Sequence, residues 1–299
     1  MILTDAAPVN EPHDAADLAS GKGATNENFP VASVLIAPRH RPVVMAFYHF
    51  ARAADDVADN GAALPEVKLA LLEDLRAGLT GETRQSPEAV ALRASLAQHG
   101  LSDQHALDLL EAFRRDVTKL RYTDWADLMD YCRYSAAPVG RFVLDVHGED
   151  RALWPMNDAL CNALQVINHL QDCGKDRRDI DRVYIPLDSL AGAGLGVEAL
   201  DAAAASPALR AVIADLARRT WMLLDLSRPF ARRVKDARLA LEIGVIQTLA
   251  EDLCKGLMRK DPLSQTVHHS KGQMGGLALL AMARTGLLRM GLSGVGDRS

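Results

Sequence analysis

The sequence predicts an all-α protein. Ala- and Leu-rich stretches recur in which apolar residues are spaced three and four apart, the period of an amphipathic helix. Convincing period-two alternation, which would indicate strands, is absent from the sequence. Its one short β-like run, residues 183–187, contains Pro186, which favours a loop or a sheet edge. Pro- and Gly-containing breaks separate the stretches without a shift in composition, so we expect one domain.

The period-3.6 pattern predicts about ten helices in all. In chain order, the stretches are 41–60, 66–79, 87–99, 102–119, 124–147, 155–175, 207–234 and 239–258. Breaks are expected at 61–65, 81–87, 148–155, 176–206 and 261–276. Segment 275–290 is apolar but contains Arg284 and Arg289, so it predicts an amphipathic or buried C-terminal helix rather than a membrane span. We expect a flexible arm over 1–23, a domain over 24–290 and a flexible tail over 291–299.

Composition excludes several classes of function. The chain has 299 residues and a net charge of −5, which gives no general attraction to nucleic acid. Its four cysteines form no C-x-x-C pair, and the acidic N-terminus lacks the pattern of a signal peptide. We therefore expect free thiols and a cytoplasmic location, with peripheral contact to the inner membrane as an open alternative.

A polar stripe follows the helix predicted at 41–60. Tyr48, Arg52, Asp55 and Asp59 are spaced by four, three and four residues and share one face, with Asp56 beside them. Like charges at this spacing disfavour a helix by a few tenths of a kcal/mol. A single stripe of this kind is most often a solvated surface, so the pattern alone does not establish a site.

The helix predicted at 155–175 carries a second stripe. Gln165, Asn168, Asp172 and Asp176 are spaced by three, four and four residues, between apolar flanks. Two polar stripes on otherwise apolar helices predict a shared cavity between them. Bare carboxylates facing one another there would repel, and Mg²⁺, which takes oxygen ligands from one or two carboxylates, water and phosphate, relieves that repulsion. The paired stripes therefore predict a clamp of about two or three Mg²⁺ ions that binds a diphosphate.

Several longer motifs carry a resemblance to a known family. They read ENFPVAS at 27–33, FYHFARAADDVAD at 47–59, FRRDVTKLRY at 113–122, YCRYSAAPVG at 131–140, NHLQDCGKD at 168–176 and DRVYIP at 181–186. In combination they resemble the squalene/phytoene synthase family, over about residues 26–276, and ENFPVAS and SAAPVGR are most similar to its hydroxysqualene synthase branch. The resemblance implies the isoprenoid synthase fold, a single helical bundle around a central apolar cavity.

The resemblance also implies a role for each motif residue. Metal ligation is implied for Asp55, Asp56, Asp59, Asn168, Asp172 and Asp176, and catalytic contact for Tyr48, Arg52, Tyr131 and Asn168. Substrate contact is implied for Asn28, Phe29, Arg52, Tyr131, Ser135, Gln165, Arg182 and Lys271, with Arg182 in a loop that closes over the site. One departure is Thr266, where the family pattern has an arginine, and another is Gly174 inside the second aspartate helix.

The implied reaction is Mg²⁺-dependent conversion of presqualene diphosphate to hydroxysqualene with release of diphosphate, without a nicotinamide cofactor. One alternative is head-to-head condensation of two farnesyl or geranylgeranyl diphosphates to presqualene diphosphate, squalene or phytoene. Another is a non-catalytic lipid-binding or assembly factor of the same family. The oligomeric state stays open.

Segment 131–139 is the candidate for placing the water that such a reaction consumes. Tyr131 and Ser135 share a helical face, and Pro138 should bend the helix and free a carbonyl. The alternative is that the Ser135 hydroxyl bonds back to its own helix.

Other polar features are expected to be structural. His49 and His169 should lie in the core or at its rim, the adjacent pair His268-His269 should not bind zinc, and Cys132 and Cys173 should not be nucleophiles.

Overall fold

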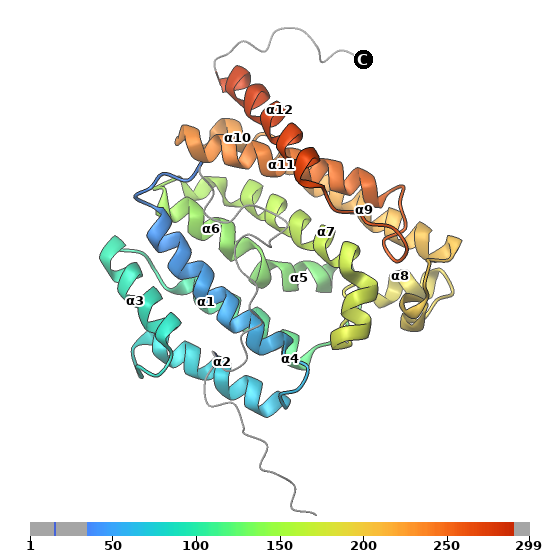
Figure 1. Cartoon of the computed structure of the whole chain (residues 1–299), viewed down its shortest axis with the longest axis horizontal. Coiled ribbons are helices and arrows are strands. Elements are labelled where there is room, and N and C mark those ends of the chain that lie inside the picture. Colours follow the sequence, from blue (N-terminus) through green and yellow to red (C-terminus); the bar gives the residue numbers. More distant parts are fainter. Residues whose placement is uncertain (1–14, 16–34, 290–299) are drawn as a thin grey trace, which may run out of the picture.

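The computed structural model describes Ala15 and residues 35–289, and it confirms the all-α prediction (Figure 1). The helices of the N-terminal half are α1 (Arg41–Asp59), α2 (Pro65–Thr80), α3 (Pro87–His99), α4 (Gln104–Thr118), α5 (Trp125–Ser135) and α6 (Ala137–Val146). Those that follow are α7 (Trp154–Ile180), α8 (Leu187–Gly192), α9 (Pro207–Ser227), α10 (Phe230–Arg233), α11 (Ala237–Leu257) and α12 (Lys271–Arg289). Two 3₁₀ turns, at Arg151–Leu153 and Val197–Asp201, complete the described elements. The β-like run contributes only one isolated bridge, between Arg121 and Val183.

Three predicted helix boundaries were wrong. The single helix expected at 124–147 is two, because Ala136 leaves the helical region (φ −122°, ψ −49°) ahead of Pro138, whose ring disfavours an unbroken helix. The helix expected at 207–234 also divides, into α9 and α10, around Pro229. Conversely, α7 does not end at Lys175 but continues to Ile180, where Asp181 adopts a left-handed conformation (φ 52°).

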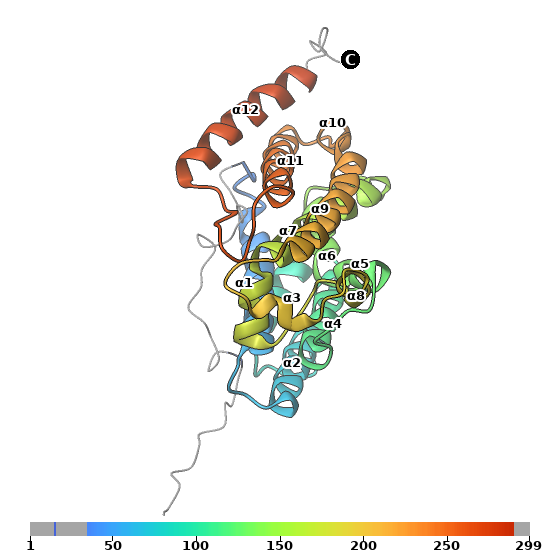
Figure 2. The same ribbon diagram turned by 90° about the vertical axis from the view of Figure 1, so that its right-hand side faces the viewer.

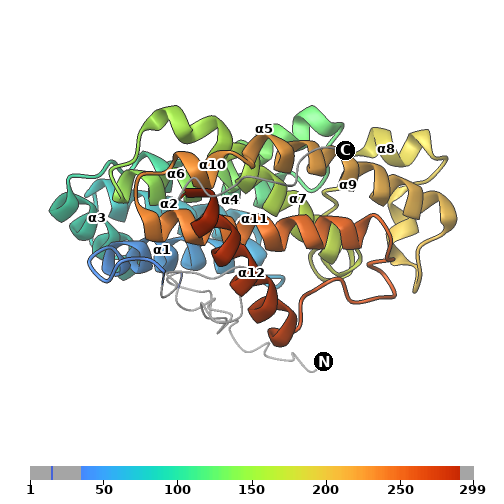
Figure 3. The same cartoon turned by 90° about the horizontal axis from the view of Figure 1, so that it is seen from above.

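Two groups of helices pack on either side of a cavity. One apolar cluster joins α1, α2, α3 and α4, and a second joins α5, α7, α9 and α11. Helix α6 bridges them, since the Phe142 ring stacks on Phe47 of α1 with ring centroids 4.0 Å apart. Helix α7 runs through the middle of the molecule, and α12 lies outermost, against α11 (Figures 2 and 3).

The length and polarity of the described helices bear on membrane topology. None of them combines enough length with enough apolar character to cross a bilayer.

Candidate active site

A cavity of about 360 Å³ lies between α1, α4, α6 and α7. Its apolar walls are Val44, Phe47, Ala51, Phe113, Val139, Phe142 and Val143. Its polar lining consists of Tyr48, Arg52, Asp55, Gln165 and Asn168. The structure thus brings members of both predicted stripes, from helices more than 100 residues apart in sequence, to one cavity. One part of this cavity suits hydrocarbon and another suits a charged group.

Arg52 lies next to the aspartates of α1. Arg52 Nη1 lies 2.6 Å from Asp55 Oδ2 and 3.9 Å from Asp56 Oδ1, and its guanidinium carbon is 6.0 Å from the centre of the Tyr48 ring. The Asp55 side chain is 35% exposed, into the cavity that it lines. Desolvation, with repulsion from Asp59, nevertheless raises the pKa of Asp55 to about 7 in spite of Arg52. The free protein therefore holds this carboxyl partly protonated at neutral pH.

The aspartates of α7 have fewer positively charged neighbours than those of α1. His268 Nε2 is 3.9 Å from Asp172 Oδ1, at the edge of a hollow of about 330 Å³ between α7 and residues 262–268. Desolvation, with repulsion from Asp172, raises the pKa of Asp176 to about 7, and Asp59 on α1 contributes to that rise. The two stripes are therefore close enough to interact electrostatically.

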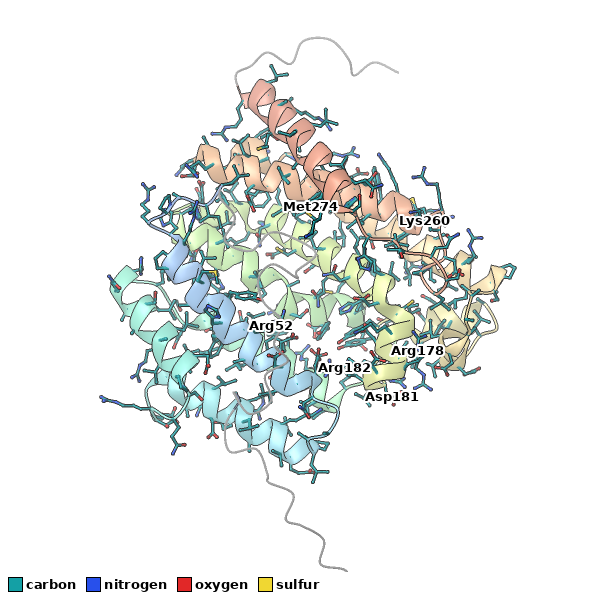
Figure 4. All side chains as sticks on the ribbon, in the orientation of Figure 1. Arg52, Arg178, Asp181, Arg182, Lys260 and Met274 are labelled. Carbon is teal, nitrogen blue, oxygen red and sulfur yellow. The ribbon has the colours of Figure 1, made fainter. Side chains whose placement is uncertain are left out.

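Arg182 joins the end of α1 to the end of α7. Its guanidinium pairs with the Asp59 carboxylate, donates to the Ala58 carbonyl at 2.7 Å, and donates through Nε to the Asp116 carbonyl at 3.0 Å. The side chain is only 6% exposed. Figure 4 shows Arg182 between the C-terminal ends of α1 and α7. A cation suits this position because the last carbonyls of α1 carry partial negative charge. Arg182 lies in the loop between α7 and α8, as expected, and its side chain is buried against the end of α1.

A buried carboxylate behind the cavity escaped the sequence analysis. Asp116 on α4 accepts hydrogen bonds from the hydroxyls of Tyr131 at 2.8 Å and Tyr184 at 2.9 Å. Desolvation raises its pKa to about 6, although Arg182 and the two tyrosines oppose that rise. The sequence did contain a sign that Asp116 is buried, because Asp116 lies on the same helical face as the buried residues Leu109 and Ala112. A charged residue on an apolar stripe indicates a functional or paired group.

The remaining predicted residues are placed as follows. Tyr131 points away from the cavity, to Asp116, and is not among the residues that line it. The Ser135 hydroxyl is buried and has no partner among the described residues, so the bond back to its own helix is not formed. Lys271 is exposed at the start of α12. Asn28 and Phe29 lie outside the described residues.

Gly174 is explained by close packing. A Cβ atom there would lie 2.6 Å from Leu263 Cδ2 and 3.1 Å from Arg178 Nη1. Gln171, one turn earlier, donates to the Val267 carbonyl at 2.5 Å. The absence of a side chain at 174 thus lets residues 262–268, which carry His268, lie directly on α7.

Of the residues expected to be structural, His49 is exposed on α1 and does not lie in the core, whereas the following three have ordinary surroundings. His169 is buried and stacks on Tyr184 with ring centroids 3.5 Å apart, and burial lowers its pKa to about 3. His269 Nε2 lies 2.9 Å from an Asp252 oxygen. Burial raises the pKa of Cys173 to about 12, so its thiolate is not available as a nucleophile.

The donor set around the cavity limits how a metal can bind. Within the described part of the chain, no three His, Cys, Asp or Glu side chains converge to hold an ion by themselves. A cation at this site therefore has to share ligands with water or a bound anion. That requirement suits Mg²⁺, which usually keeps several waters and takes only one or two protein carboxylates.

Comparisons with known proteins place the chain in a family. The model of the squalene/phytoene synthase family matches residues 23–273. The chain is 57% identical over 272 residues to the hydroxysqualene synthase of Zymomonas mobilis, which covers 90% of this chain and 92% of that protein. It is 54% identical over 254 residues to the hydroxysqualene synthase of Rhodopseudomonas palustris, covering 85% and 87% respectively. The crystal structure of a squalene synthase from Alicyclobacillus acidocaldarius matches with a TM-score of 0.69 at 34% identity, over 82% of this chain and 92% of that one. The chain therefore belongs to the squalene/phytoene synthase family and is an enzyme that acts on a prenyl diphosphate.

Proposed function

We propose that this enzyme converts presqualene diphosphate and water to hydroxysqualene and diphosphate in the presence of Mg²⁺. The observation that carries the proposal is the cavity itself, in which apolar walls meet the polar stripes of α1 and α7. The names of the relatives at 57% and 54% identity favour this reaction over others of the family.

The acidic residues fit Mg²⁺. Asp55 and Asp176 have pKa values raised to about 7 by burial and by neighbouring carboxylates, which is the electrostatic condition that a divalent cation relieves. Asp55 and Asp59 on α1, with Asp172 and Asp176 on α7, would hold about two or three ions together with water and the diphosphate. When bound, the metal would neutralise charge on the departing diphosphate.

The chain's own residues account for the rest of the chemistry. Arg52 would contact the diphosphate, since it lies beside Asp55 and lines the same cavity. The stacked rings of Phe47 and Phe142 would hold the hydrocarbon and exclude bulk water while the cation exists. Tyr48, whose ring lies near Arg52 at the cavity wall, would stabilise that cation through its π face.

The reaction balances without a reductant. The carbon–oxygen bond to diphosphate breaks, the electron pair leaves with diphosphate, and a water oxygen bonds to the rearranged cation and loses one proton. The proposal therefore needs no nicotinamide cofactor. The water needs a polar position in an apolar enclosure, and the buried, unpartnered hydroxyl of Ser135 offers one.

The test is product analysis with purified protein. Incubation with Mg²⁺ and presqualene diphosphate should give hydroxysqualene and one equivalent of diphosphate, whereas farnesyl diphosphate should not be consumed. Squalene, phytoene or presqualene diphosphate made from farnesyl or geranylgeranyl diphosphate would establish the condensation alternative instead.

Metal binding has a readout that does not depend on turnover. Mg²⁺ with inorganic diphosphate should raise the melting temperature of the wild type, because a ligand at about 100 times its Kd stabilises the folded state by about 2.7 kcal/mol. An unchanged melting temperature at saturating concentrations of both would contradict the clamp.

A further inference from the structure

Helix α12 presents an uncovered apolar face to the outside of the molecule. Leu279, Leu280 and Leu287 are 67%, 63% and 49% exposed. The exposed small residues Gly276 and Ala283 lie on the same side, and a Cβ atom at Gly276 would meet nothing within 4 Å. Helix α12 contains no Asp or Glu. Its exposed face is therefore unlike that of an ordinary surface helix, which is polar.

The opposite face of α12 is already used for packing. Ala281 and Thr285 are buried against α11, and Thr285 lies so close to Gly244 that a Cβ there would sit 2.1 Å from its Oγ1. Among the described elements, the main packing partners of α12 are α11 and α10. A surface helix normally turns its polar side to solvent, whereas α12 also exposes leucines. The exposed leucines thus predict a further surface that covers them.

The charge of the chain is distributed unevenly. Residues 207–289 contain 14 Lys or Arg and 7 Asp or Glu, a net charge of +7. Since the whole chain carries −5, the remainder carries −12. The layer that includes α12 is therefore basic on an acidic protein, and it attracts anionic surfaces that the rest of the molecule repels.

Unpaired basic residues flank the apolar face. Arg232 and Arg233 of α10 and Arg284 of α12 are exposed, and none forms an ion pair with a residue that the structure describes. Arg232 and Arg284 meet at a small pocket of about 80 Å³ between α9, α10, α11 and α12. Exposed leucines next to basic side chains are the combination by which a peripheral protein binds an anionic bilayer.

We propose that the outer face of α12, with the arginines of α10 and α12 at its rim, docks the protein on an anionic membrane surface. The leucines would enter the headgroup region and the arginines would contact lipid phosphates. Helix α12 lies on the same side of the molecule as α1, which lines the cavity, so docking would bring the active site near the bilayer (Figures 2 and 3). Only the reason for docking, delivery of a lipid product, rests on the proposed function.

Vesicle sedimentation of the full-length protein without substrate tests the proposal. The wild type should bind vesicles of phosphatidylcholine mixed with phosphatidylglycerol, bind phosphatidylcholine alone weakly, and release as salt increases. Arg232→Gln with Arg284→Gln should lower the partition coefficient on anionic vesicles by roughly ten- to thirtyfold, from about fivefold for each basic residue. Leu279→Ser with Leu280→Ser should lower it by roughly tenfold or more.

Matched variants away from α12 control for nonspecific effects. Leu64→Ser removes a leucine that is 64% exposed at the start of α2, and Arg84→Gln with Arg133→Gln removes two exposed charges from the acidic part. Neither should change vesicle binding. Thermal melting separates loss of binding from loss of fold, and the arginine variants, whose side chains are exposed, provide a test independent of the leucines.

Three outcomes would overturn the proposal. They are wild-type protein that binds neither vesicle type, binding that does not depend on anionic lipid, and α12 variants that bind as the wild type does. A dimer that Leu279→Ser with Leu280→Ser converts to monomer, without vesicle binding, would show that a second copy covers this face. If the protein forms hydroxysqualene but does not bind vesicles, only the docking proposal is wrong. If it binds vesicles but forms no hydroxysqualene, only the proposed reaction is wrong.

Discussion

Each of the two stripes carries a pair of aspartates four residues apart, but the ion pairs that these aspartates form differ. On α1, Arg52 pairs with Asp55 and buried Arg182 pairs with Asp59. On α7, Asp172 has only His268 at 3.9 Å, and Asp176 forms no ion pair within the described residues. The same aspartate spacing thus gives one stripe in which Asp55 and Asp59 are paired with arginines, and one in which Asp176 has no ion-pair partner among the described residues.

The difference indicates how the metal-free enzyme tolerates its site. On α1, the guanidinium groups of Arg52 and Arg182 stabilise the carboxylates when no metal is bound. A paired carboxylate costs much less free energy to desolvate than an isolated one. Asp176 on α7 has no such pair within the described residues, and burial raises its pKa to about 7, as it also raises that of Asp55 in spite of Arg52. We therefore expect substitutions in the two stripes to have similar effects on activity, and Asp59→Asn and Asp176→Asn to have opposite effects on metal-free stability.

The largest expected effect is on turnover, where the stripes should behave alike. Asp55→Asn and Asp176→Asn should each reduce diphosphate release from presqualene diphosphate by about 10²–10³-fold, because each removes a carboxylate that would hold the Mg²⁺ needed to neutralise the departing diphosphate. Asp179→Asn, an exposed position on α7 that pairs with Lys175, is the matched control. Near-normal rates in both site variants would show that the stripes do not act together.

Arg182 should give the largest effect on stability. Arg182→Met leaves the Asp59 carboxylate and the Ala58 carbonyl without their buried cation, so it should lower the free energy of unfolding by about 3 kcal/mol. Arg177→Met, which breaks only partly exposed pairs, should cost about 1 kcal/mol or less. Urea unfolding measures both, and equal losses would mean that Arg182 is not specially important to α1.

The sign of the stability change should differ between the stripes. In a metal chelator, Asp176→Asn should stabilise the protein by about 1 kcal/mol, because it removes a desolvated carboxyl near Asp172. Asp59→Asn should destabilise it by about 1–2 kcal/mol, because Arg182 loses its carboxylate. Urea unfolding measures the free energy of unfolding of both variants. If both variants were stabilised, or both destabilised, the proposed electrostatic difference between the stripes would be wrong.

The advantage of Asp176→Asn should also depend on pH. The folded-state pKa of Asp176, about 7, lies above the unfolded value of about 3.9, so the folded protein binds the extra proton between these values. Its contribution to stability is therefore complete below about pH 4 and is lost as pH rises through about 7. Melting temperatures of wild type and variant should be close at low pH and diverge up to pH ~8. A gap that stayed constant with pH would contradict the raised pKa.

The smallest expected effect concerns a residue outside both stripes. Ser135→Ala should change the ratio of alcohol to hydrocarbon products from presqualene diphosphate more than it changes diphosphate release, because the buried hydroxyl is free to hold a water. Tyr131→Phe is a less direct test, since it also removes the hydrogen bond to Asp116. An unchanged product ratio in Ser135→Ala would exclude this hydroxyl from water placement.

The sequence by itself determined the helical architecture and the two polar stripes. Both follow from local periodicity, because residues three and four apart share a helical face whatever the rest of the fold does. The motifs around these stripes also identified the family, and the comparisons confirmed it. The break at Ala136 was partly foreseeable from Pro138, while the extension of α7 through Asp176–Ile180 was hidden by its polar, loop-like composition.

Only the tertiary structure decided which charges meet. Arg182 reaches Asp59 across 123 positions in the chain, and Tyr184 reaches Asp116 across 68. No local pattern encodes such pairs, because they depend on how α1, α4 and the end of α7 are packed together. The same packing gives Asp59 an arginine partner and Asp176 none among the described residues, and it leaves the apolar outer face of α12 uncovered. Sequence periodicity specifies which residues share a face of a helix. Which other helix packs against that face depends on how all the helices together bury their apolar surfaces.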